Sequence, residues 1–150
     1  MKTKTVYLAA PFFNQAELNL VKQVETLAGQ FKSIELFSPR SQGILKDMPE
    51  AERKQAAKHV FDMNLQHLAY ADYVIALLDA KDTGTIWEIG YAYTASKIIG
   101  VTTTGAPINI MISECLDYHS PSLESLCNVL HHLDAHGELP PPQTSIASVY

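Results

Sequence analysis

The chain has 150 residues, 47% of them hydrophobic and 18% charged, a composition typical of a globular protein long enough to bury a sizeable core. Its net charge of −5 at pH 7 argues against a DNA or RNA partner, because binding polymer phosphates needs clustered Lys and Arg, although a single nucleoside ligand remains compatible with it. No stretch approaches the ~20 consecutive apolar residues of a membrane span, so we expect no membrane association.

The first part of the chain alternates between strand and helix patterns. Thr5–Ala10 is predicted to be a buried strand from its β-branched and aromatic content. Asn14 is predicted to cap the helix that follows, with Glu17 three residues later as its capping-box partner. A second short strand, Ile34–Ser38, is expected to end at the proline that comes next.

The middle of the chain contains a long helix and the most apolar strand. The polar connection Pro39–Pro49 is longer than an ordinary strand-to-helix loop, and such loops are usually functional or mobile. Glu50–Ala71 is predicted to be a helix, and Tyr73–Leu78 a central strand. Another helix is predicted over Thr85–Ser96. The apolar residues expected to face inward from the long helix are Ala57, Val60, Phe61, Leu65 and Leu68.

The last part of the chain is predicted to add two strands and a helix. Ile98–Thr103 has the pattern of a fourth strand, and a short apolar segment follows at Ile110–Ile112. Cys115–Tyr118 is the candidate fifth strand. A final helix, Ser122–His136, is expected to be capped by Ser120.

This alternation predicts an α/β protein, a flavodoxin-like three-layer sandwich around a parallel five-stranded sheet of order 2-1-3-4-5. We expect residues 1–150 to form one domain. In such a sheet the ligand crevice lies beside strands 1 and 3, at their carboxyl ends. The loop Ala10–Phe13 is therefore predicted to lie beside the acidic loop after the central strand.

Two carboxylates, Asp82 and Glu88, follow the central strand with Gly84 between them. Two acids at one crevice indicate glycosyl-type chemistry, with one acid as the nucleophile and the other as the proton donor or the group that holds the base. The structural alternative is equally open on spacing alone. An acid near the start of a helix offsets the helix dipole, and an Asp before a Gly is ordinary turn chemistry.

Three aromatic residues are candidates for the same crevice. Tyr7 is placed to orient a carboxylate through its hydroxyl, or else to be an ordinary core tyrosine. Phe12 and Phe13 are placed to stack against a flat base, or to act as a hydrophobic staple for the next helix. The turn before them has no Gly-rich or Walker pattern, which argues against a dinucleotide or triphosphate cradle.

Neither the cysteines nor the histidines predict a metal site. Cys115 and Cys127 are far apart and form no CxxC pair, so we expect free thiols in a reducing, cytoplasmic compartment. His132 and His136 are four residues apart on the last helix without a matching ligand set, and a solvated helix face explains them better.

Four motifs in a fixed order carry a resemblance that spans nearly the whole chain. The motifs are VYLAAPFF at Val6–Phe13, SPRSQ at Ser38–Gln42, DTGTIWEIGYAY at Asp82–Tyr93 and PINIM at Pro107–Met111. With these motifs the chain resembles the nucleoside 2-deoxyribosyltransferases, and the terminal Val149 and Tyr150 are also similar to the ending of several members.

The resemblance implies catalytic roles for three residues. Glu88 matches the nucleophile that attacks the anomeric carbon of a 2'-deoxyribonucleoside and expels the base. A second base then attacks the covalent deoxyribosyl-enzyme, which gives base exchange with retention. Tyr7 matches the tyrosine that positions this glutamate, and Asp82 matches the acid that assists proton delivery to the leaving base.

The resemblance also implies binding residues and partners. Gln42 matches a base-contacting glutamine, and Asn109 matches an asparagine that members supply to a neighbouring subunit's site. Phe12, Phe13, Gly84 and Tyr150 complete the set expected to contact substrate. The implied partners are deoxyribonucleosides, free nucleobases and further copies of the chain in a dimer-based oligomer, possibly a hexamer, with no metal or organic cofactor.

One position departs from the family pattern. Many members carry a second base-reading aspartate in the helix before the central strand, where this chain has Asn64. An amide both donates and accepts hydrogen bonds, but it cannot deliver a proton as a carboxylic acid does. Asp82 is then the only aspartate left in that role, and Asn64 is either a substrate-binding residue or a helix residue that contacts the loop.

Two other functions remain open at this point. One is a hydrolase of the same architecture acting on deoxynucleoside 5'-monophosphates, with Arg40 and Ser41 binding the phosphate. The other is a non-catalytic nucleotide-sensing module, because the fold alone serves many roles. The context of Asn109 favours free nucleosides over monophosphates.

Overall fold

The computed structural model describes residues 2–43, 45–142 and 149–150, and it contains the predicted parallel sheet. The strand order is β2-β1-β3-β4-β5, which confirms the expected order 2-1-3-4-5. All neighbouring strands are parallel, so their carboxyl ends share one edge. The strands are β1 (Lys4–Ala9), β2 (Ile34–Phe37), β3 (Tyr73–Leu77), β4 (Lys97–Val101) and β5 (Tyr118–Ser120).

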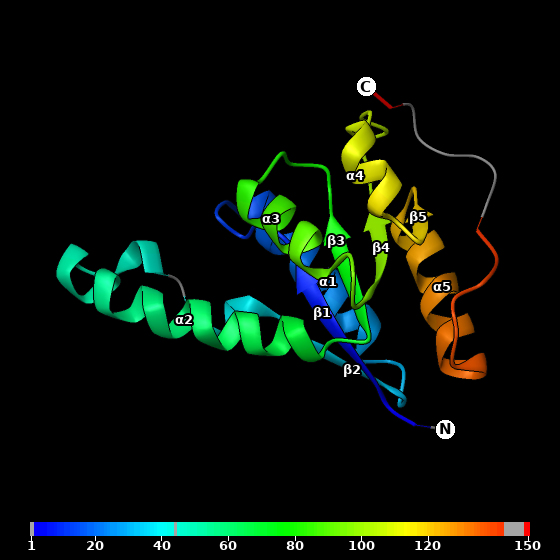
Figure 1. The fold of residues 1–150 in the computed structure, drawn as a ribbon, viewed down its shortest axis with the longest axis horizontal. Helices are drawn as coiled ribbons and strands as arrows, with labels where there is room; N and C mark the ends of the chain where they lie inside the picture. The colour runs from blue at the N-terminus through cyan, green and yellow to red at the C-terminus, as the bar shows by residue number, and fades with distance from the viewer. Residues whose placement is uncertain (1, 44, 143–148) are drawn as a thin grey trace.

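Helices cover both faces of this sheet and complete the three layers (Figure 1). One core cluster joins the sheet to α1 and α5, and the other joins it to α2, α3 and α4. The helices are α1 (Gln15–Ala28), α2 (Glu50–Tyr70), α3 (Thr83–Ala92), α4 (Ile110–Cys115) and α5 (Leu123–His136), with 3-10 turns η1 (Pro39–Gln42) and η2 (Leu45–Asp47).

The central strand β3 shows why its sequence is continuously apolar. Tyr73 and Ile75 belong to the cluster on the α1 and α5 face, whereas Val74 and Ala76 belong to the cluster on the opposite face. Successive side chains of a strand point to opposite faces, so a strand covered on both sides needs apolar residues at every position. All five residues of β3 are buried.

The last strand and the helix boundaries beside it differ from the prediction. Cys115 ends α4 instead of opening a strand, and β5 lies further on at Tyr118–Ser120. Ser120 lies at the end of β5, and its buried hydroxyl makes no hydrogen bond to the residues that the structure describes, so it does not cap a helix. Ser122 caps α5 instead, by accepting a hydrogen bond of 3.0 Å from the backbone N–H of Ser125.

Helix α2 is less buried than its apolar pattern predicts. Leu68 is the one residue of α2 that is fully buried, while Ala57 is exposed and Phe61 is 49% exposed. The helix reaches well beyond the edge of the sheet in Figure 1, so its first turns have no sheet to pack against. No helix in the described part of the chain is both long enough and apolar enough to cross a membrane.

Candidate active site

A cavity of about 510 Å³ lies where the ends of β1 and β3 meet α2 and α3. Its size is within the range of small-molecule sites, about 300–1,000 Å³. Seven of the predicted site residues line it: Tyr7, Phe12, Phe13, Asn64, Asp82, Gly84 and Glu88. The parallel sheet brings them together because β1 and β3 are neighbours and end at the same edge.

A buried tyrosine and a glutamate form the polar centre of this cavity. Tyr7 is fully buried on β1, and its hydroxyl donates a hydrogen bond to Oε2 of Glu88 on α3. Burial raises the pKa of Glu88 to about 7; the Tyr7 hydrogen bond opposes this rise and the charge of Asp82 adds to it. Burial, followed by the charge of Glu88, raises the pKa of Tyr7 above its usual value. Tyr7 therefore stays a donor while Glu88 changes its charge near neutral pH.

Asp82 both caps α3 and lines the cavity. Its Oδ2 accepts two hydrogen bonds of 2.8 Å, from the backbone N–H and from the hydroxyl of Thr85. This cap starts α3 at Thr83, two residues earlier than the sequence pattern predicts. Asp82 therefore has a structural role as a helix cap, and the same residue also lines the cavity.

The other acid of this loop, Asp79, is held by a neighbouring loop. Its carboxylate accepts hydrogen bonds from the backbone N–H groups and hydroxyls of Thr103 and Thr104. These bonds tie the loop after β3 to the loop after β4. Asp79 therefore has a structural task at the edge of the sheet.

Phe12 and Phe13 stack on each other, and both line the cavity. Their ring centroids are 5.5 Å apart with an interplanar angle of 22°. Phe12 also packs against the core beneath α1, whereas Phe13 is 54% exposed at the cavity. The backbone N–H of Phe13 donates to Glu17, so the start of α1 fixes this aromatic pair.

Asn64 reaches the cavity from α2, one turn before the buried Leu68. Its Oδ1 is buried and accepts no hydrogen bond from the part of the chain that the structure describes. A buried acceptor without a partner costs free energy, so unpaired groups are uncommon away from functional sites. Asn64 is therefore a polar side chain without a partner for its Oδ1 among the described residues, in a mostly apolar cavity wall.

Three predicted residues do not line this cavity. Gln42 ends η1, immediately before Gly43, which does line it. Asn109 and Tyr150 instead line a separate hollow of about 380 Å³ beside Lys81. Asn109 caps α4 there by accepting a hydrogen bond from a backbone N–H, and the Lys81 ammonium lies 4.6 Å from the centre of the Tyr150 ring.

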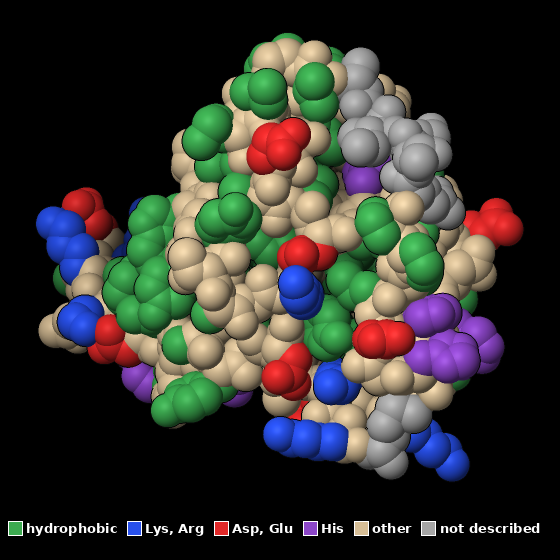
Figure 2. Space-filling model, turned by 45° about the vertical axis from the view of Figure 1, so that its right-hand side comes forward, with side chains coloured by type: hydrophobic (Ala, Val, Ile, Leu, Met, Phe, Trp, Pro, Cys, Tyr) green, Lys and Arg blue, Asp and Glu red, His purple; other side chains and the backbone are tan. Residues whose placement is uncertain are grey.

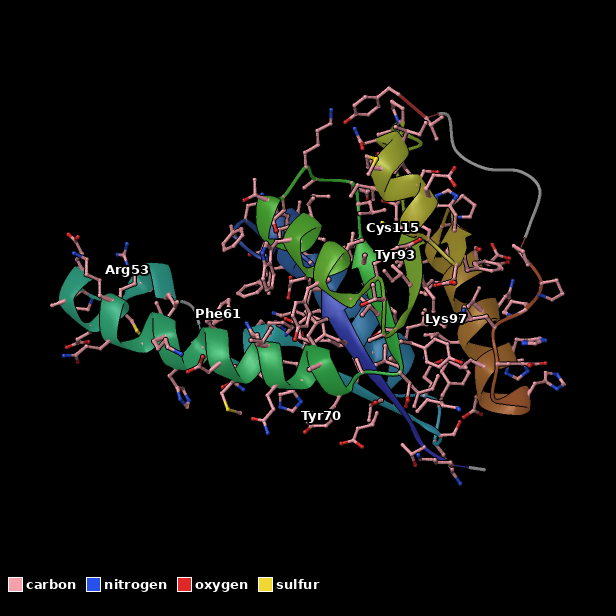
Figure 3. All side chains as sticks on the ribbon, in the orientation of Figure 1. Arg53, Phe61, Tyr70, Tyr93, Lys97 and Cys115 are labelled. Carbon is pink, nitrogen blue, oxygen red and sulfur yellow. The ribbon has the colours of Figure 1, made fainter. Side chains whose placement is uncertain are left out.

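The sequence did not identify the apolar wall of the cavity. Val60, Phe61 and Leu65 were predicted to be core residues of α2, yet all three line the cavity. Phe61 points from α2 toward α3 (Figure 3), where its ring centroid lies 5.9 Å from that of Trp87. Trp87 is 50% exposed and was not predicted as a site residue. Apolar helical spacing looks the same whether a face meets a core or a cavity.

Arg40 is not placed to bind a ligand in this cavity. Its Nε donates to both carboxylate oxygens of Glu25 on α1, and Nη2 lies 2.6 Å from Oε1 of the same residue. Ser41 lines a different hollow, beside Glu25. None of the described side chains that line the cavity belongs to a Lys or Arg, and among the described residues no cluster of His, Cys, Asp and Glu is arranged to hold a metal ion.

Comparison with known proteins supplies an independent view of this cavity. Residues 6–130 match the family described as nucleoside 2-deoxyribosyltransferase. A solved 2-deoxyribosyltransferase from Bacillus psychrosaccharolyticus, described as a biocatalyst for nucleoside synthesis, is 30% identical with a TM-score of 0.71. The match covers 83% of this chain and 90% of that one.

A second solved structure, a conserved protein from Enterococcus faecalis V583, shares the fold. It is 21% identical with a TM-score of 0.54, and the match covers 88% of each chain. A search among curated proteins gave no match.

Proposed function

The chain belongs to the nucleoside 2-deoxyribosyltransferase family, and from this premise we propose that it exchanges the nucleobase of 2'-deoxyribonucleosides. The observation that carries the proposal is the hydrogen bond from the buried Tyr7 to Glu88, inside a cavity that Asp82 also lines. A carboxylate with a strongly raised pKa and a fixed donor is typical of a catalytic group.

The proposed chemistry is a double displacement at C1' of the deoxyribose. Ionised Glu88 forms a bond to C1' while the electron pair of the C1'–N bond passes to the base. Asp82 gives a proton to the departing base, and Tyr7 holds the glutamate in line. A second base then reverses these steps, and two inversions give overall retention. Exclusion of water by the bound base favours transfer over hydrolysis.

The charge of the cavity supports a neutral nucleoside as the substrate. A 5'-monophosphate needs cationic groups, yet Arg40 is paired with Glu25 and none of the described cavity-lining residues is Lys or Arg. The monophosphate hydrolase is therefore the weaker candidate. A non-catalytic sensor is weaker still, because mere binding does not need a half-buried glutamate whose ionisation costs stability.

Base preference is proposed to depend on Asn64. Its amide sits in the cavity where a second carboxyl group would place another charge near Glu88 and Asp82. We expect Asn64→Asp to shift the preference among bases or the pH dependence of exchange. Identical profiles for several bases before and after the substitution would remove Asn64 from the site.

We further propose that the working form is a homo-oligomer in which Asn109 completes a neighbouring copy's site. Asn109 lies outside the cavity of its own chain, and it is flanked by Ile110 and Met111, which are 53% and 73% exposed. Hydrophobic side chains gather over α4 at the top of Figure 2. Exposed apolar clusters of this kind mark interfaces. Light scattering should show an assembly of several copies. Met111→Glu should weaken this assembly and lower the exchange activity with it.

The cellular setting is proposed to be the cytoplasm. Cys115 and Cys127 are both free thiols in the structure. Unpaired cysteines are typical of a reducing compartment. Labelling of both thiols in protein taken from freshly broken cells tests this directly.

The test of function is a chromatographic assay with deoxyinosine, with and without adenine. Appearance of deoxyadenosine only when adenine is present supports base exchange. Free deoxyribose as the main product, with or without adenine, would identify a hydrolase. Glu88→Ala should abolish exchange while leaving the fold intact, because the side chain is on the cavity wall rather than in the core.

A further inference from the structure

Thr85 is a buried residue with an unusual connection to the site. It is 1% exposed and does not line the cavity, so it cannot touch a substrate. Nevertheless both its backbone N–H and its hydroxyl donate to the same oxygen of Asp82, each at 2.8 Å. Whatever Thr85 contributes to the reaction must therefore act through Asp82.

The hydroxyl bond goes beyond what capping a helix requires. The side chains of Asn14, Asn109 and Ser122 cap α1, α4 and α5 by accepting from one backbone N–H each. Among the capping side chains of the described helices, only Asp82 accepts a second hydrogen bond, from the hydroxyl of the same residue whose backbone N–H it accepts. One backbone donor is enough for a cap. The second donor thus has another explanation.

The two donors make the oxygens of Asp82 unequal. Oδ2 accepts from both groups of Thr85, whereas Oδ1 accepts no hydrogen bond from the residues that the structure describes. A carboxylic acid carries its proton on one oxygen, and a proton on Oδ2 would face two donor hydrogens. Oδ1 is therefore the oxygen on which a proton is stable.

The neighbouring glycine leaves room for this carboxylate. A Cβ atom at Gly84 would lie 3.3 Å from Oδ2 of Asp82, which is tight for such a contact. Gly84 leaves room for Oδ2, the oxygen that accepts two hydrogen bonds, and it also lines the cavity. The segment from Asp82 to Thr85 thus fixes Oδ2 and leaves Oδ1 without a hydrogen bond to the described residues, on a side chain that lines the cavity.

We propose that Thr85 is a positioning residue for proton transfer, whose hydroxyl fixes Asp82 so that Oδ1 gives its proton to the departing base. This inference rests on the proposed base exchange. As Glu88 bonds to C1', the C1'–N electron pair passes to the base, and a base nitrogen takes the proton from Oδ1 of Asp82. When the second base enters, its N–H proton returns to Oδ1.

The test compares two donor nucleosides that differ in their need for this proton. The base of deoxyinosine leaves best when it receives a proton. The base of 7-methyl-2'-deoxyguanosine is already cationic, so it leaves as a neutral base without a proton. Thr85→Val removes the hydroxyl but keeps the shape and the backbone N–H. We expect its kcat to fall about tenfold or more with deoxyinosine, since general acid catalysis contributes about 10²–10⁴-fold, and to change little with the methylated donor.

Two further variants separate positioning from folding. Thr85→Ser keeps the hydroxyl and should restore kcat with deoxyinosine to near the wild-type value. Ser122→Ala removes a capping hydroxyl at α5 and should lower thermal stability without distinguishing the two donors. If Thr85→Val does not fold, Thr85→Cys carries the same comparison, because a thiol is similar in size and a weak donor.

The outcomes are distinct. Equal losses with both donors, or no loss with deoxyinosine, overturn the role of Thr85 while wild-type exchange still supports the proposed function. Folded wild-type protein that exchanges no base with either donor overturns the proposed function and the inference with it. A loss confined to deoxyinosine and reversed by Thr85→Ser supports both.

Discussion

Replacing Glu88 by Gln is expected to stabilise the protein at alkaline pH. The pKa of Glu88 is raised from 4.5 to about 7 chiefly because the half-buried carboxyl group is partly removed from water. A difference of that size between the folded and unfolded chains corresponds to about 3 kcal/mol. Gln is nearly isosteric and its amide oxygen still accepts the hydrogen bond from Tyr7, so the substitution removes mainly the buried charge.

The sign of the effect follows from the raised pKa. The folded chain holds the Glu88 proton more tightly than the unfolded chain, so this contribution to stability is complete below pH 4.5 and is lost as the pH rises through about 7. Glu88→Gln has no ionisable group at this position, so its stability does not fall for this reason as the pH rises. Its advantage over wild type in the free energy of unfolding should grow by up to about 3 kcal/mol between pH 4 and pH 8.5, or about 6–12 °C in Tm.

Urea unfolding across this pH range, at one protein concentration, measures the difference. The fixed concentration matters because assembly contributes to apparent stability. Glu35→Gln on β2 is the matched control, since Glu35 is an exposed carboxyl group and should show no comparable trend. A Glu88→Gln advantage that stays constant from pH 4 to pH 8.5 would contradict the buried-charge explanation.

Three further substitutions test separate parts of the structure. Tyr7→Phe removes the donor that lowers the pKa of Glu88, so the acidic limb of the pH profile of kcat/KM should move to higher pH; a limb that stays in place argues against the contact. Asp82→Asn removes a nearby negative charge, and should move the same limb to lower pH while slowing turnover with deoxyinosine. Gly100→Ala places a Cβ 2.5 Å from Cδ1 of Leu116, so urea unfolding should show a loss of about 1–3 kcal/mol in the free energy of unfolding. Unchanged stability would mean that the Leu116 side chain moves aside easily.

The central sheet and the pairing of Tyr7 with Glu88 in the cavity were predictable because strong local signals coincide there. Tyr73–Leu77 is apolar at every position, as a strand covered on both faces must be. Strand ends in a parallel sheet meet at one edge, so Tyr7 and Glu88 were expected in the same crevice, and the structure joins them by a hydrogen bond.

Weaker or non-local signals explain the differences. The three residues of β5 are too few to show a strand period, and the preceding apolar residues belong to the short helix α4. The apolar face of α2 has the spacing of a core helix, although Phe61 borders a cavity. The double hydrogen bond from Thr85 to Asp82 needed the geometry of the folded turn, because the sequence shows only a Thr three residues after an Asp.

The central claim, that Glu88 forms a covalent bond to the deoxysugar, is tested most directly by mass spectrometry of the trapped enzyme. Wild-type protein is incubated with deoxyinosine without an acceptor base, quenched in acid and digested. We predict one added deoxyribosyl group on the peptide that contains Glu88, absent from Glu88→Gln and lost from wild type when adenine is added before quenching. A deoxyribosyl group on any other residue, or the same modification in Glu88→Gln, would contradict the account.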